Sequence, residues 1–152
     1  MSTDELEEMG PVDYVLIEWP AGSQPSGEGA PILVDLVERG IIRVLDLAFI
    51  TKGEDGSVAG LDIAELGQND EQLRMFEGAS SGLLSDDDTA EAAEALEPGT
   101  SAMLLVYENR WAAPLASAAR RSGAQLVATG RIPVQAVLAA LDAAEKAEAA
   151  KP

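Results

Sequence analysis

The chain has 152 residues, enough for one domain with a substantial core, and hydrophobic residues make up 47% of it. It contains no cysteine and no histidine, which excludes disulfides, thiolate metal sites and the commonest general base. A formal net charge of −17 disfavours nucleic acids and anionic membranes as partners, because both are bound through clustered lysines and arginines. We therefore expect no cofactor, no nucleic acid and no membrane partner.

The first ten residues are expected to be a disordered tail, since they carry four acids and no base. A signal peptide would instead be basic and then apolar, and no apolar run in the chain approaches the length of a transmembrane helix. These features predict a cytoplasmic protein. Its single α+β domain is expected over residues 11–148, with a polar insertion at about 64–84 and a frayed end at 149–152.

Apolar periodicity predicts strands and helices in turn along the chain. The strands are expected at residues 12–19, 41–52, 57–63, 101–108 and 124–131. The helices are expected at residues 31–39, 85–96 and 111–122 and from Pro133 onward, with a short additional helix at 70–77. The acids Asp86–Asp88 fit the first turn of a helix better than a calcium loop, because the alternating D-x-D-x-D-G spacing is missing.

The stretch 41–52 is the most informative of the expected strands, because its two faces are both apolar. Strict alternation places one set of apolar residues on one face, Ile41, Leu45, Leu47 and Phe49. The opposite face receives Ile42, Val44, Ala48 and Ile50. A strand of this kind is normally buried on both sides.

The first six elements follow the order β-α-β-β-α-β, which is typical of a ferredoxin-like core. That fold has the sheet order 4-1-3-2, with its helices on one face. An added strand at 124–131 would join beside the fourth strand, and its right-handed crossover would place the helix 111–122 on the same face. The C-terminal helix would leave much of the opposite face open, and an open apolar face predicts a homo-oligomer, most simply a dimer.

Two sequence matches to catalytic or nucleotide-binding motifs fail on their chemistry. Residues 78–82 match the G-x-S-x-G nucleophile elbow, but the chain has no histidine to activate the serine. Gly22 and Gly27 have the spacing of a phosphate loop, but Glu28 stands where the lysine is required. A flexible linker and a plain connecting loop explain these segments better, although an anion could still meet the helix N-terminus.

Charge is distributed unevenly along the second half of the chain. Residues 65–99 carry ten acids and one base, Arg74, whereas residues 109–131 carry no acid. Ordinary solvated faces explain this pattern most simply. Trp111 is then a core residue that shares one helix face with Leu115, Ala118 and Ala119. The alternative is that the basic segment binds the acidic one, within or between subunits, or an acidic protein partner. The candidate partner-binding residues are Arg110, Trp111, Arg120, Arg121 and Arg131.

Several phrases, VDYVLIEWP, DLVERGIIRVLDLAFITKGEDGSV, LEPGTSAMLLVYENRWA and GAQLVATGRIP, resemble a small actinobacterial family of unknown function. The resemblance covers nearly the whole chain after residue 10 and implies no activity. A broader family is similar around the second strand and before the fourth. It carries a glycine-rich hairpin, described as membrane-associated, where this chain has the polar residues 64–84. Membrane association is therefore not implied.

The sequence favours a non-enzymatic interaction or regulatory protein that acts as a homo-oligomer. One alternative is a small-ligand or anion-binding module that uses the loop at residues 20–29. Another is a cofactor-free enzyme on a ferredoxin-like dimer, with arginine, tyrosine and carboxylates as its polar groups. A closed, partly polar pocket would favour the alternatives, whereas a flat apolar face would favour the interaction protein.

Overall fold

The structure is a computed structural model that describes residues 8–23, 27–61 and 85–151. The chain divides into two compact units, Met1–Ser122 and Gly123–Pro152, and each is described by itself. Several predictions lie outside the described residues. They concern most of the acidic tail, the polar insertion with Arg74, the helix at 70–77, and the G-x-S-x-G match at 78–82.

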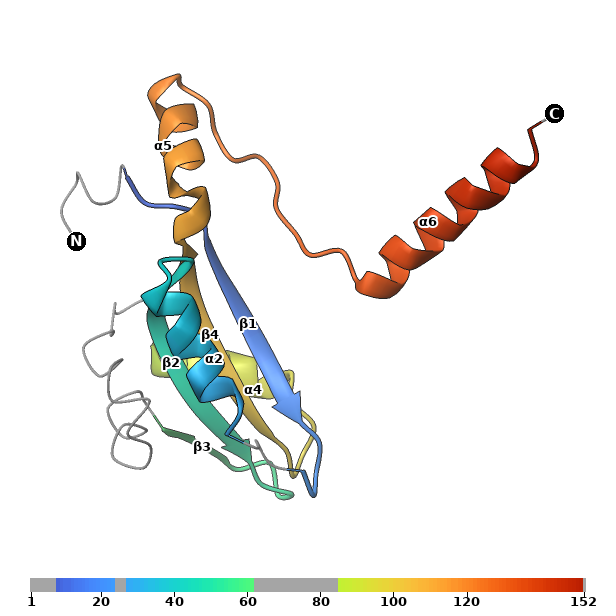
Figure 1. Ribbon diagram of the computed structural model, residues 1–152. Coiled ribbons are helices and arrows are strands. Elements are labelled where there is room, and N and C mark those ends of the chain that lie inside the picture. Colours follow the sequence, from blue (N-terminus) through green and yellow to red (C-terminus); the bar gives the residue numbers. More distant parts are fainter. Residues whose placement is uncertain (1–7, 24–26, 62–84, 152) are drawn as a thin grey trace. The chain divides into compact units, whose positions relative to one another are not determined.

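The first unit is built on a four-stranded antiparallel sheet, so the α+β class is confirmed. The strands are β1 (Val12–Trp19), β2 (Ile42–Lys52), β3 (Val58–Leu61) and β4 (Ser101–Asn109). Their order across the sheet is β1-β4-β2-β3 (Figure 1). The ferredoxin-like order 4-1-3-2 is therefore wrong, because β4 rather than β1 lies in the interior of the sheet.

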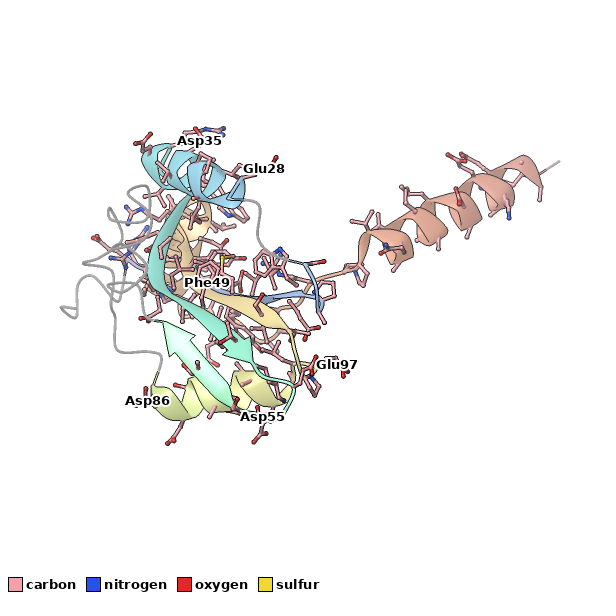
Figure 2. The ribbon with its side chains drawn as sticks, turned by 90° about the horizontal axis from the view of Figure 1, so that it is seen from below. Glu28, Asp35, Phe49, Asp55, Asp86 and Glu97 are labelled. Atoms are coloured by element: carbon pink, nitrogen blue, oxygen red, sulfur yellow. The ribbon has the colours of Figure 1, made fainter. Side chains whose placement is uncertain are left out.

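The helices α2 (Gly29–Glu38) and α4 (Asp86–Glu94) cover opposite faces of this sheet (Figure 2). Under α2 lies a core of Leu33, Ile42, Val44, Leu47 and Leu105. The core on the α4 side consists of Ile50, Ala93, Leu96, Ala102 and Leu104. The prediction of helices mainly on one face is wrong. The two apolar faces of β2 are buried because each one meets a helix of the same subunit.

A β-bulge at Leu45 changes which residues of β2 share a face. The register with β4 shifts between Val44 and Asp46, so strict alternation fails at this point. As a result Val44 and Leu47 both lie in the core under α2, although alternation predicts them on opposite faces. One inserted residue reverses the direction of the side chains that follow it.

The ends of the two helices follow the predicted signals. Gly40 has a positive φ of 70° after α2, and the N–H of Ile41 bonds to the carbonyl of Leu36 at 3.0 Å, as in a Schellman motif. The helix α4 begins with a capping box, in which Ser85 and Asp88 bond to each other's backbone N–H groups. Asp88, one of the three acids at its start, therefore acts as a helix-capping group.

After β4 the chain forms the 3-10 turn η2 (Arg110–Ala112) and the helix α5 (Ala113–Arg121). The second unit contains α6 (Val134–Ala149), as the apolar spacing after Pro133 predicts. Residues 124–131 form no strand, so the prediction of a fifth strand is wrong. A strand requires a neighbour, and this unit taken alone offers none. No helix in the described ranges is long and apolar enough to cross a membrane.

Candidate interaction surface

The surface around η2 is organised by a buried carboxylate at the end of β4. The side chain of Glu108 is only 2% exposed and accepts a hydrogen bond from Arg43 Nε at 2.9 Å. Its other oxygen accepts one from the backbone N–H of Gly10 at 2.8 Å. Nη1 of Arg110 lies 3.7 Å from Oε1 of Glu108, so Arg110 is a second, more exposed counter-charge. Both oxygens of the buried carboxylate are therefore satisfied by donors.

The hydrogen bond to Glu108 fixes Gly10, just before β1, against η2 and α5. A Cβ atom at Gly10 would lie 2.3 Å from the carbonyl oxygen of Asn109 and 3.2 Å from Ala113, so only glycine fits at this position. One residue earlier, the carbonyl of Met9 accepts a hydrogen bond from Arg120. Glu108 thus holds Gly10, and Arg120 holds its neighbour Met9.

Trp111 is exposed but held in a defined position. Its side chain is 67% exposed, while its backbone N–H bonds to the carbonyl of Ile41 at 3.2 Å. Its indole Nε1 donates to Oδ1 of Asn109 at 3.3 Å. One helical turn later, Leu115 is 74% exposed. The prediction of Trp111 and Leu115 on a buried helix face is wrong, because this helix begins with η2 at the end of β4.

The structure places four of the five candidate residues in the first unit. Arg110 and Trp111 lie in η2, and Arg120 and Arg121 lie in the last turn of α5. Arg131 belongs to the second unit, so it is not assigned to this surface. Sequence reasoning missed Arg43 and the exposure of Leu115. A signal for Arg43 existed, because it interrupts the apolar run of β2 and therefore required a counter-charge.

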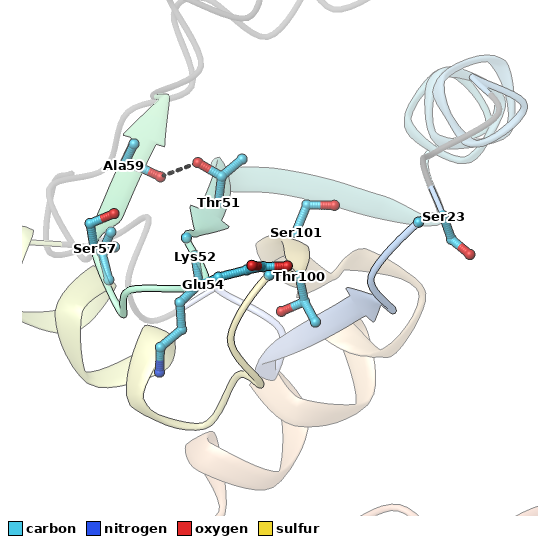
Figure 3. A pocket seen from close by; sticks show the side chains of 12 residues that line it. Ser23, Thr51, Lys52, Glu54, Ser57, Ala59, Thr100 and Ser101 are labelled. Atoms are coloured by element: carbon cyan, nitrogen blue, oxygen red, sulfur yellow. Dashed lines mark hydrogen bonds between the residues drawn. The ribbon is translucent and has the colours of Figure 1, made fainter.

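A separate, open pocket of about 930 Å³ lies where the β2–β3 hairpin meets the loops after β1 and before β4. Hydroxyl groups dominate its polar lining (Figure 3), from Ser23, Thr51, Ser57, Thr100 and Ser101. Lys52 also belongs to the lining, but its Nζ donates to the carbonyls of Ala93 and Leu96 at 3.0 and 3.1 Å. Its ammonium group therefore caps the end of α4.

The pocket includes Gly22 and Ser23 from the loop that the sequence suggests as an anion site. Glu54 lines it as well, so its described charges do not favour an anion. The loop glycines Gly22 and Gly27 both have a φ of 84°, which suits a tight connection. In the described part of the chain, no group of three acids could hold a metal ion.

The family model of a family of unknown function, DUF6325, matches residues 8–149, which is nearly the whole chain. The chain belongs to this family. No curated protein and no solved structure matches it. Membership agrees with the resemblance seen in the sequence, and it assigns no reaction, ligand or partner. The surface around η2 and the hydroxyl-lined pocket must therefore be judged on their own chemistry.

Proposed function

We propose that this protein is a non-enzymatic interaction module that binds an acidic protein segment through the surface around Trp111. We call this the η2 surface and define it by Arg110, Trp111 and Leu115, with Arg120 and Arg121 in the last turn of α5 as additional positive charges. The observation that carries the proposal is the exposed Trp111, which is held in place by hydrogen bonds from both its backbone and its indole ring. A fixed aromatic residue loses little conformational entropy when a partner covers it.

The charges of the η2 surface define the chemistry of its partner. Residues 109–131 carry four arginines and no acid in a chain whose net charge is −17. Among the described residues, Arg110 forms an ion pair with Glu108, which is buried and already paired with Arg43. The exposed part of the surface therefore combines apolar side chains with positive charge, and tryptophan and arginine are the residues most enriched in binding hot spots. An acidic segment with an apolar anchor complements it.

Affinity capture from native lysate tests this proposal. The wild-type protein is compared with Trp111→Ser and with Ile32→Ser, a matched control because Ile32 is 62% exposed on α2. We expect the captured partner to be acidic, to be lost with Trp111→Ser and to be retained with Ile32→Ser. Binding should weaken as salt rises, because exposed charges are screened over about 10 Å at 0.1 M salt. Equal capture by all three proteins would refute the proposal.

The hydroxyl-lined pocket supports a second candidate, a module that binds a neutral, hydroxyl-bearing small molecule. Five serine and threonine residues line the pocket, and the ammonium group of Lys52 is engaged at the end of α4. A thermal-shift panel of sugars and polyols tests this alternative, with Ser101→Ala as the test variant. Stabilisation that Ser101→Ala removes would favour the ligand-binding role over the interaction module.

A further inference from the structure

The outer edge of β1 is long, and in the described part of the first unit no strand, proline, lysine or bulge protects it. β1 ends the sheet, so no described strand pairs with its outer side. It runs for eight residues without proline or lysine, and its register with β4 is continuous. Natural edges are normally blunted by proline, lysine, a bulge or short length. The opposite edge strand, β3, has only four residues.

The ladder with β4 shows which backbone groups of β1 point outward. The carbonyl of Pro11 accepts a hydrogen bond from the N–H of Asn109 at 2.7 Å, and the register pairs Val12 with Glu108. Residues of an antiparallel pair alternate between hydrogen-bonded and non-hydrogen-bonded positions. The odd-numbered residues of β1 therefore bond to β4. The outward N–H and C=O groups belong to Val12, Tyr14, Leu16 and Glu18.

Both carboxylates of β1 are turned toward β4 rather than toward the free edge. Asp13 accepts a hydrogen bond from the side-chain amide of Asn109 at 2.9 Å. Glu18 accepts hydrogen bonds from the backbone N–H of Glu97 at 2.9 Å and from the hydroxyl of Thr100 at 3.1 Å. The charged groups that would repel an incoming strand are thus hydrogen-bonded within the subunit, although the side chain of Glu18 is exposed.

We infer that two copies of the chain associate by pairing the outer edges of their β1 strands across a two-fold axis, which joins both sheets into one. An axis at Leu16 pairs the outward groups of Tyr14 with those of Glu18 of the second copy. On the α2 face, Val15 then lies opposite Ile17 of the second copy. No two like charges are opposed in this register, so β1 is complementary to itself.

This interface does not depend on the η2 surface, and it responds to salt in the opposite way. Each copy carries a net charge of −17, so two copies repel each other. Salt screens this repulsion and should strengthen the pairing, whereas it should weaken the binding of an acidic segment by arginines. The dimer and the partner-binding role can therefore fail separately.

Analytical ultracentrifugation of the full-length chain over a range of concentrations tests the inference. We expect a reversible dimer that tightens with salt. Tyr14→Pro removes an outward N–H that the β1–β4 ladder does not use, and proline is tolerated at such edge positions. It should raise the dissociation constant at least about tenfold. Tyr14→Ser keeps the N–H and loses only a cross-strand side-chain contact, so its effect should be at most about fivefold.

Hydrogen exchange measured by NMR on the wild-type chain gives a readout that does not depend on any variant folding. The amides of Tyr14, Leu16 and Glu18 should become protected as the concentration rises, whereas those of Val15 and Ile17 should be protected throughout. A monomer at every concentration would overturn the inference. A dimer in which these outward amides stay unprotected would also overturn it. The same holds if the Tyr14→Pro protein is folded and its dimer is no weaker than that of Tyr14→Ser.

Discussion

Replacing Glu108 by glutamine should destabilise the protein through a single unsatisfied donor. The substitution keeps the shape of the side chain, but its amide group then faces either the N–H of Gly10 or Nε of Arg43, both within 2.9 Å of the present carboxylate. Two donors cannot bond to each other, so one charge-assisted hydrogen bond is lost. Such a bond contributes about 1.5–3 kcal/mol.

The other contributions of Glu108 are smaller because its counter-charges reach solvent. The side chain of Arg43 is 40% exposed and that of Arg110 is 52% exposed, so water can solvate both guanidinium groups after the substitution. The full cost of an unpaired buried charge, about 3–5 kcal/mol, therefore does not apply. We expect a loss of about 2–3 kcal/mol in the free energy of unfolding, which lowers Tm by roughly 4–12 °C.

Urea unfolding followed by circular dichroism measures this loss, with Glu38→Gln as the matched control on an exposed site of α2. The control should stay within about 0.5 kcal/mol of the wild type. A double-mutant cycle with Arg43→Met should show coupling between the two residues. If Glu108→Gln proves as stable as the control, the carboxylate does not organise this end of the sheet and the reasoning is refuted.

Two further predictions concern the ends of α4. Lys52→Met removes both hydrogen bonds to carbonyls at the end of this helix, so it should lower the free energy of unfolding by about 1–2 kcal/mol in the same assay. At the other end, the backbone N–H and then the hydroxyl of Ser85 lower the pKa of Asp88 from its ordinary value of 3.8. Because its pKa is lowered in the folded state, the ionised Asp88 stabilises the fold at any pH above 3.8. This stabilisation is lost as the pH falls below 3.8 and through the lowered pKa. The stability difference between wild type and Asp88→Asn should therefore narrow in acid, and a constant difference from pH 7 to pH 3 would contradict the assignment.

Local signals in the sequence predicted most elements, because each depends on a few neighbouring residues. The cap at Ser85 and the stop at Gly40 are examples, and both have the expected geometry. The order of strands depends instead on which strand is apolar on both faces. Between residues 102 and 107 β4 carries no charge, whereas β1 carries Asp13 and Glu18 on opposite faces. That comparison would have placed β4 in the interior of the sheet.

The candidate site was only partly predictable for a related reason. The arginines near Trp111 stood out as a charge pattern, but periodicity assigned Trp111 and Leu115 to a buried face. That assignment assumed that the helix packs on the sheet along its whole length. The helix instead follows β4 directly through η2, so both side chains are exposed. The bulge at Leu45 was equally hidden, because an inserted residue leaves no mark in an apolar run.

The hydrogen bond between Arg120 and the carbonyl of Met9 has a practical consequence for how the protein is handled. A tag joined directly to Met9 in a shortened chain would begin beside Arg120 in the last turn of α5. An affinity tag or fluorescent label at that end would compete for the same surface, and an acidic tag would do so most strongly. Comparing partner capture with and without such a tag would itself test whether the last turn of α5 contributes to binding.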